Sequence, residues 1–228
     1  MYITARALAF HRTPPRRTRT AHSFKKAATT EELREIFKLR YKVYCEEKGF
    51  ERSEDHPGGI EYDEFDKSSR HFMVTSGPRL VIGTARLILD SGKGLPVREN
   101  CKIEADLSRL ETGRLAEISR LAISKEYMKD LGISSHRSRQ EVICGLYKLI
   151  YIESRMLGLT HWLAVMTEGL SELLKRSGIV FAPIGPPADY HGIRTPYIGS
   201  IADIEAQVSK INPGFFRETR EEFKLLMQ

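Results

Sequence analysis

The chain has 228 residues, is 41% apolar, and carries a formal net charge of +6 with three cysteines. This length suits one domain with a substantial core, and no apolar run approaches the ~18 residues that span a membrane. We expect no secretory signal, because no apolar segment follows the first basic residues. The odd cysteine count without CxxC spacing argues against a disulfide framework and fits reduced thiols in a cytosolic protein.

The positive charge comes from the N-terminal segment. Residues 1–29 hold seven basic residues and no acidic one, which leaves 29 basic against 30 acidic residues in the rest of the chain. We expect residues 1–21 to be a basic tail on a single domain of residues 22–228. The tail is open to three interpretations: a solvated extension, a transit peptide, or an arm for an acidic partner such as an anionic membrane or a carrier protein. The near-neutral body and the lack of interleaved aromatics argue against specific nucleic-acid binding.

Apolar spacing and turn residues predict the elements in chain order. The first half reads as a strand near 22–28, a helix over 31–48 with Thr30 as N-cap, an acidic loop over 51–68, a hairpin of strands 71–75 and 79–89, and an irregular segment over 90–113 with a helical turn at 103–110. The second half reads as a strand over 115–123, a helix over 137–156, a strand over 161–165, a helix over 167–176, strands over 179–184 and 193–199, and helices near 202–210 and 214–226.

The strand–helix–strand unit around the long helix indicates a parallel strand pair, whereas the earlier hairpin is antiparallel. The chain is therefore predicted to be α/β, with a mixed central sheet and helices on both faces.

Four blocks then occur in a fixed order. They are LRYKVYCEEKGF at 39–50, EYDEFD at 61–66 with His71-Phe72 behind it, GTARL at 83–87, and EISRLA at 117–122. Together they resemble the autoinducer-synthase-like branch of the GNAT acyltransferases. The first block is most similar to long-chain N-acyl amino acid synthases and to acyltransferases associated with PEP-CTERM/exosortase systems. The same is true of three downstream segments: Pro183-Ile184-Gly185, His191-Gly192 and Pro196-Tyr197-Ile198.

The resemblance implies a GNAT-type fold and direct transfer of a fatty acyl group to the amine of an amino acid or a similar small molecule. The donor would be the acyl-phosphopantetheine of acyl carrier protein, or acyl-CoA, with no permanently bound cofactor. Acyl-homoserine-lactone synthesis, acetyl-CoA-dependent N-acetylation and a non-enzymatic binding module remain alternatives. Phe50 stands where homoserine-lactone synthases usually have tryptophan, which argues against S-adenosylmethionine as acceptor.

The stretch before the long helix departs from the pyrophosphate loop of ordinary GNAT enzymes. It reads GISSHRSR at 132–139, where those enzymes have Gln/Arg-x-x-Gly-x-Gly/Ala. A helix N-terminus with serines and arginines still binds phosphate. We therefore assign donor phosphate or carrier binding to His136, Arg137 and Arg139, and favour a carrier protein, whose arm has one phosphodiester.

Aminolysis of a thioester needs a base for the amine and donors for the developing oxyanion. Glu117 is the candidate general base, and Ser119 is a candidate donor to substrate. The alternatives are an ion pair of Glu117 with Arg86 or Arg120, and a backbone hydrogen bond for Ser119. Regular alternation would place Glu117 and Ser119 on one face of the strand, and Ile118 and Arg120 on the other.

A charged cluster is predicted to order the acidic loop over the acceptor site, unless its members form ordinary surface ion pairs. Its members are Arg40, Asp63, Asp66, Arg86 and Arg120. An acyl tunnel is assigned to Trp162, Leu163 and Met166, with core packing as the alternative. Cys45 is expected to be a small core residue, and the spacing of His, Cys and Asp predicts no metal site.

Overall fold

The computed structural model describes residues 22–90, 94–108, 110 and 113–215. The strands are β1 (His22–Lys26), β2 (Ser69–Ser76), β3 (Leu80–Leu89), β4 (Leu115–Ile123), β5 (His161–Met166), β6 (Ala182–Pro183), β7 (Ala188–Asp189) and β8 (Ile193–Ser200). The helices are α1 (Thr30–Tyr41), α2 (Pro96–Asn100), α3 (Lys125–Asp130), α4 (His136–Met156), α5 (Glu168–Arg176) and α6 (Ile201–Ile211).

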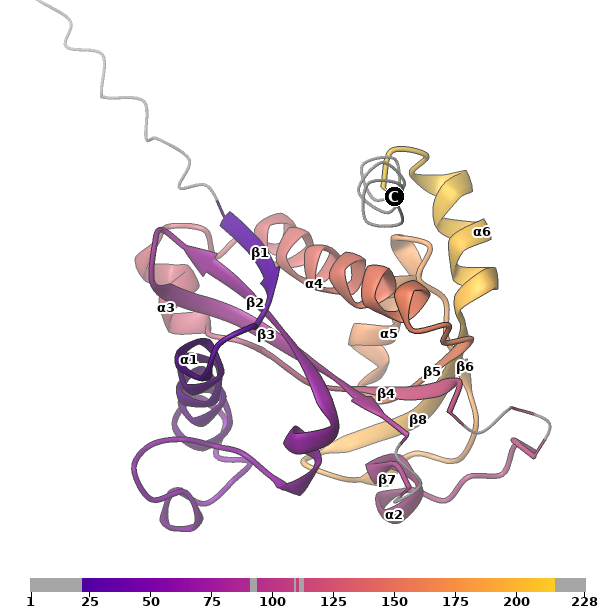
Figure 1. Cartoon of the computed structure of the whole chain (residues 1–228), viewed down its shortest axis with the longest axis horizontal. Coiled ribbons are helices and arrows are strands. Elements are labelled where there is room, and N and C mark those ends of the chain that lie inside the picture. The colour runs from indigo at the N-terminus through magenta and orange to yellow at the C-terminus, as the bar shows by residue number, and fades with distance from the viewer. Residues whose placement is uncertain (1–21, 91–93, 109, 111–112, 216–228) are drawn as a thin grey trace, which may run out of the picture.

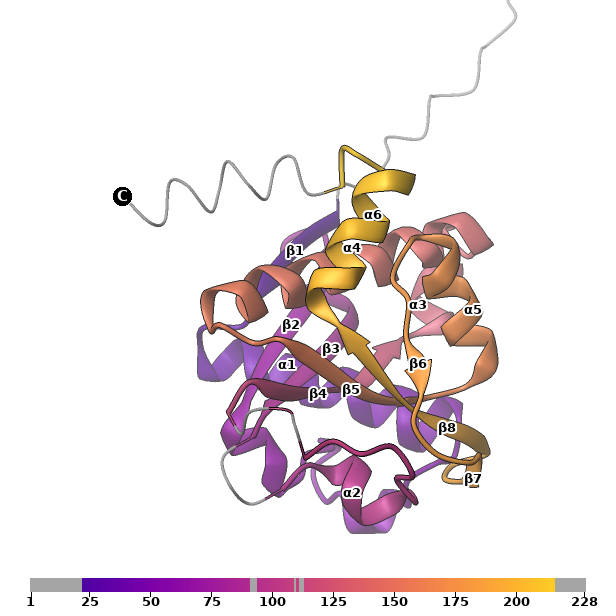
Figure 2. The same cartoon turned by 90° about the vertical axis from the view of Figure 1, so that its right-hand side faces the viewer.

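These elements form the predicted α/β architecture. One eight-stranded sheet runs in the order β1-β2-β3-β4-β5-β8-β6, with β7 paired to β8. The β4–β5 pair is parallel, and its neighbours pair antiparallel. Helix α4 covers one face of the sheet, and α1 and α2 lie on the other (Figures 1 and 2).

Several boundaries differ from the sequence prediction. Helix α1 is capped by Thr29 instead of Thr30, because the Thr29 side chain accepts from the Glu32 amide while the Glu32 carboxylate accepts from Thr29 N–H. A π-helical segment, Lys42–Glu47, continues α1. The acidic loop contains two short 3₁₀ helices, Ser53–Asp55 and Glu64–Ser68.

The helical turn predicted between β3 and β4 was placed at the wrong residues. It forms at α2 instead of 103–110, because Pro96 at the first helical position is pre-organised for a helix. Helix α3, capped by the Ser124 side chain, was not predicted. The strand expected over 179–184 pairs only at β6. Most of the predicted helix at 214–226, and the tail at 1–21, lie outside the described residues.

Strands β4 and β5 separate partway along their length. Their parallel register ends at the pair Ile118 and Ala164, while β4 runs on to Ile123 and β5 to Met166. A bulge in β4 lies nearby, since Arg86 pairs with Ser119 but Thr84 pairs with Ala122. Bulges bend and twist a strand. The sheet therefore opens into a V at its centre.

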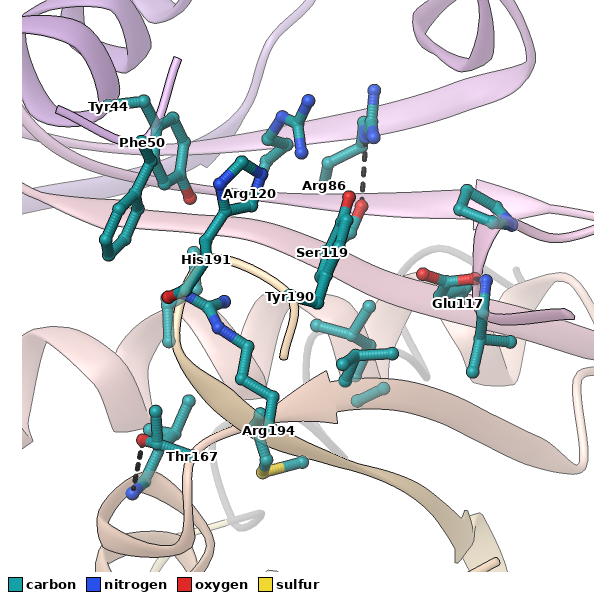
Figure 3. Close-up of a pocket in the computed structure, with 18 of the residues that line it drawn as sticks. Tyr44, Phe50, Arg86, Glu117, Ser119, Arg120, Thr167, Tyr190, His191 and Arg194 are labelled. Carbon is teal, nitrogen blue, oxygen red and sulfur yellow. Dashed lines mark hydrogen bonds between the residues drawn. The ribbon is translucent and has the colours of Figure 1, made fainter. Parts of the chain in front are cut away.

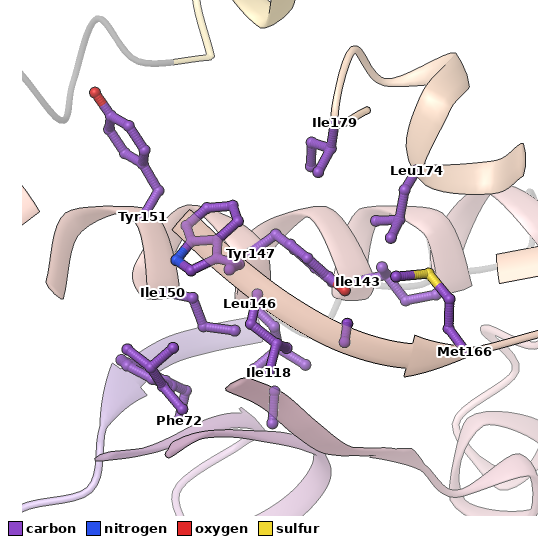
Figure 4. Close-up of a cluster of buried hydrophobic side chains, with 14 of the residues drawn as sticks. Phe72, Ile118, Ile143, Leu146, Tyr147, Ile150, Tyr151, Met166, Leu174 and Ile179 are labelled. Carbon is purple, nitrogen blue, oxygen red and sulfur yellow. The ribbon is translucent and has the colours of Figure 1, made fainter. Parts of the chain in front are cut away.

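Each face of the sheet has its own hydrophobic core. On the α4 face, Leu146 and Ile150 are fully buried against strand residues such as Phe72 and Ile118 (Figure 4). On the other face, Val97 of α2 packs with Leu163, and Ile36 of α1 packs in a separate cluster. Within the described part of the chain, no helix combines the length and apolar character needed to cross a bilayer.

Candidate active site

A cleft of about 270 Å³ lies where β4 and β5 diverge (Figure 3). Its walls come from both strands, the start of α4, the segment after α1, the acidic loop and the β7–β8 hairpin. One side carries charged residues such as Glu117 and Arg86, and the other carries apolar ones such as Ile143 and Met166. The cleft thus has two sides. We call the side on the α1 face the polar chamber and the side on the α4 face the apolar chamber.

Glu117 is a buried carboxyl at the polar side of the cleft. Its side chain is 3% exposed, and its Oε2 accepts a 2.8 Å hydrogen bond from Val97 N–H. Burial raises its pKa to about 7, against the opposing effects of the Val97 amide and of Arg86 and Arg120. A carboxyl with a pKa near the working pH suits proton uptake. The two arginines pair instead with acids of the loop, which leaves Glu117 outside the ion-pair network.

Ser119 is held by Arg86. The two residues face each other in the β3–β4 register, and Arg86 Nε donates to Ser119 Oγ at 3.0 Å. Because Ser119 Oγ is the acceptor in this bond, its own hydroxyl proton stays available for a ligand.

The five residues of the predicted charged cluster come together. The acidic loop turns at Asp63, whose carboxylate accepts from Phe65 N–H, while the Asp66 carboxylate accepts from Asp63 N–H. Arg86 Nη1 then lies 2.5 Å from Asp63 and 2.8 Å from Asp66, and Arg40 Nη1 lies 2.7 Å from Asp66. Burial would raise the pKa of Asp66, but Arg40 and Arg86 outweigh it and lower the pKa to about 2.

Arg120 contradicts the regular strand alternation. At the bulge its φ is +50°, a left-handed conformation uncommon outside glycine. Its side chain reaches Glu61 at 3.0 Å and Asp63 at 3.2 Å, so it joins the cluster that Arg86 also contacts. Glu61, which is 1% exposed and also binds Arg40 Nε, is a member that sequence reasoning missed.

Aromatic residues from two distant segments also line the cleft, and sequence reasoning did not assign them to the site. The Phe50 ring stacks on His191 at 5.4 Å, and Arg194 Cζ lies 5.3 Å from its centroid. Tyr44 and Tyr190 complete this wall (Figure 3). The sequence did contain a signal for this wall, because Tyr44, Phe50 and His191 belong to the segments that carry the family resemblance.

Of the residues assigned to donor phosphate, Arg139 lines the cleft. His136 is exposed as the first residue of α4, and Arg137 is exposed in a 3.2 Å ion pair with Glu141. Two further cations, Lys48 and Arg194, line the cleft with Arg139.

These three cations share one positive region. Partial burial lowers the pKa of Lys48, and repulsion from Arg194 and Arg139 lowers it further. Among the ion pairs of the described residues, none joins any of the three to a carboxylate. The cleft therefore contains three cations without a direct ion-pair partner among the described residues, although Glu47 attracts Lys48.

The residues assigned to an acyl tunnel take different positions. Met166 lines the cleft. Trp162 is packed in the α4-side core with its Nε1 donating to Ser154 Oγ at 2.8 Å, and Leu163 is buried on the opposite face. Strand alternation separates them, since residues 162, 164 and 166 face α4. Among the described residues, no group of three or more His, Cys, Asp or Glu has metal-binding geometry.

Comparison with models of known protein families gives one match. The family model of the N-acyl amino acid synthase FeeM matches residues 35–202. No curated protein sequence matches the chain significantly.

Solved structures match across most of their own length. TofI, in a ternary complex with an inhibitor and MTA, is 15% identical, covers 85% of this chain and 98% of its own, and has a TM-score of 0.63. FeeM from uncultured soil microbes is 14% identical over 82% and 94%, with a TM-score of 0.58. BjaI, a CoA-dependent acyl-homoserine lactone synthase solved with SAM and isopentyl-CoA, is 19% identical over 78% and 81%, with a TM-score of 0.57. At these identities the structures show a shared fold.

Proposed function

The chain belongs to the FeeM family of N-acyl amino acid synthases and is an acyltransferase that acts on an amine, and we propose that it joins a long-chain fatty acyl group, delivered as a thioester, to the amine of an amino acid. The observation that carries this assignment is Glu117, a buried carboxyl with a pKa of about 7 at the edge of the β4–β5 cleft.

The donor arm enters the cleft where the three cations line it. Arg139, Lys48 and Arg194 hold the phosphate of the phosphopantetheine arm, because cations without a carboxylate partner favour an anionic ligand. The arm then lies between the diverging strands, and the acyl chain enters the apolar chamber beside Ile143 and Met166. We favour acyl carrier protein as the donor, with acyl-CoA as the alternative that the BjaI complex illustrates for that enzyme.

The acceptor occupies the polar chamber and is acylated directly. The Glu117 carboxylate takes a proton from the acceptor's ammonium group, and the neutral amine attacks the thioester carbon. The Ser119 hydroxyl donates to the substrate as negative charge develops on the carbonyl oxygen. The carbon–sulfur bond breaks and an amide forms as the attacking nitrogen gives its second proton to the departing thiolate. Glu117 then releases the first proton to solvent. The acidic loop is held over this chamber by the charged cluster of Arg40, Asp63, Asp66, Arg86 and Arg120.

Reconstitution of the purified protein tests this function. We would supply acyl carrier protein loaded with fatty acids of several lengths, or the matching acyl-CoAs, with the proteinogenic amino acids and S-adenosylmethionine, and identify products by mass spectrometry. We expect N-acyl amino acids, lost in Glu117→Gln and retained in Glu153→Gln, since Glu153 is a buried glutamate on α4 that pairs with Lys26.

An acyl-homoserine lactone as the product would instead identify the alternative activity. No amide with any donor would reject the proposal. The preference for carrier protein over CoA is read from the same assay, whereas association with an exosortase system and a cytoplasmic location remain predictions from the sequence.

A further inference from the structure

One wall of the cleft leads inward along α4 and stops at an aromatic ring. Arg139, Ile143 and Tyr147 line the cleft at intervals of four residues, so they share one face of the helix. Eight residues of helix rise about 12 Å, which sets the length of this wall. The residues that follow on that side, Ile150 and Tyr151, are packed in the hydrophobic core. Tyr147 is therefore the last side chain of the wall.

The opposite wall stops at the same level. On β5, Met166 and Ala164 line the cleft, and the next residue on that face, Trp162, is buried in the core. The apolar chamber is therefore open toward Met166 and closed at Tyr147. Figure 4 shows Tyr147 on α4 beside β5.

The Tyr147 ring is held in place by two aromatic rings on the side away from the cleft. It meets the rings of Trp162 and Phe181 edge-on, at centroid distances of 6.3 and 6.4 Å, and these two rings stack on each other at 6.4 Å. Trp162 is anchored in turn by its hydrogen bond to Ser154. The side chain of Tyr147 is 2% exposed although it lines the cleft, so its small open surface faces the chamber. A ring held this way has little room to move aside for a longer ligand.

We propose that Tyr147 is the floor of the acyl chamber and sets the longest acyl chain that this enzyme transfers. The inference rests on the proposed function, which places the acyl chain between α4 and β5. Each methylene that reaches the chamber improves kcat/KM by roughly fourfold, the equivalent of about 0.8 kcal/mol of buried CH₂. The gain ends when the chain meets the Tyr147 ring, because the backing rings are buried and packed.

The test is the chain-length profile of kcat/KM, measured with saturated acyl thioesters lengthened stepwise. Tyr147→Ala opens the chamber onto the apolar faces of Trp162 and Phe181, so the roughly fourfold gain per methylene should continue beyond the wild-type cut-off. Tyr147→Trp raises the floor and should move the cut-off to shorter chains. Tyr147→Phe keeps the ring and should keep the cut-off. Ile150→Ala, a core truncation outside the cleft, controls for destabilisation alone.

The outcomes separate the inference from the function on which it rests. Opposite shifts in Tyr147→Ala and Tyr147→Trp, with neither in Ile150→Ala, support Tyr147 as the floor. An active enzyme whose cut-off is the same in every variant overturns the inference and leaves the proposed function standing. A wild-type protein that transfers no acyl chain overturns both. If Tyr147→Ala does not fold, the direction of the shift in Tyr147→Trp decides.

Discussion

The burial of Glu117 should destabilise the protein at the pH where it catalyses. The pKa of this carboxyl is about 7 in the folded protein, against an ordinary value of 4.5. Its ionisation therefore costs more free energy in the folded state than in the unfolded state. Between pH 4.5 and 7 the unfolded chain loses this proton first, so stability falls as pH rises and the full cost persists above pH 7. At about 1.4 kcal/mol per pKa unit, the cost comes to about 3 kcal/mol.

Replacement of Glu117 by glutamine removes this titration and keeps the side-chain shape. At pH 5 we expect Glu117→Gln and wild type to be close in stability. At pH 8 we expect the variant to be more stable by up to about 3 kcal/mol, or about 6–12 °C in Tm for a domain of this size, although it is inactive. Urea unfolding at a series of pH values measures the difference directly, because titrations common to both proteins cancel.

Glu153→Gln is the matched control. Glu153 is 7% exposed and pairs with Lys26 at 2.7 Å and Arg70 at 3.2 Å, so its loss should lower stability at neutral pH instead of raising it. The reasoning about Glu117 is refuted if Glu117→Gln is less stable than wild type at pH 8, or if the difference does not change between pH 5 and 8. The first result would mark Glu117 as a stabilising carboxylate, and the second would show that folding does not raise its pKa. Activity gives a second reading, since kcat/KM of the wild type should rise through about pH 7.

Other expectations concern separate parts of the site. Arg194→Ala should raise KM for acyl-phosphopantetheine several-fold and leave KM for acyl-pantetheine, which lacks the phosphate, unchanged. Asp66→Asn leaves Arg40 and Arg86 short of a buried partner and should cost about 3–5 kcal/mol in urea unfolding; an unchanged midpoint would contradict it. Trp162→Phe removes the indole donor from buried Ser154 and should cost about 1–3 kcal/mol in the same assay. Burial raises the pKa of Cys45 to about 11, so iodoacetamide should modify it slowly at pH 8 and Cys45→Ala should keep full activity; rapid labelling at Cys45 would argue otherwise.

The sequence was informative where the signal is local. The period of apolar residues located α4 and its neighbouring strands, and the turn residues located the β2–β3 hairpin, because both depend on residues a few positions apart. Local signals were weaker in short segments, which made the position of α2 between β3 and β4 ambiguous and hid α3 after β4. The ordered motifs carried the family, and the family match over residues 35–202 agrees with them.

The sequence also selected the charged residues of the site, but it did not determine how they are arranged. Arg120 reaches the acidic loop only because the bulge turns it away from the strand's alternation. Glu117 acquires a pKa near 7 only through its burial behind α2, whose amide at Val97 touches it. A motif specifies residue types, whereas burial depends on segments far apart in the chain.

The substrate chambers belong wholly to the tertiary structure. Phe50, His191 and Arg194 meet across more than 140 residues of chain, and Tyr147 closes the apolar side only because β4 and β5 separate in front of it. Trp162 was assigned to the tunnel from its position on the strand after the long helix. The pairing of β5 instead places it behind the Tyr147 ring. By itself the sequence determined the type of fold and the chemistry the chain can perform. The divergence of two strands decided where that chemistry takes place, because it follows from strand register and bulge geometry, which residue types alone do not specify.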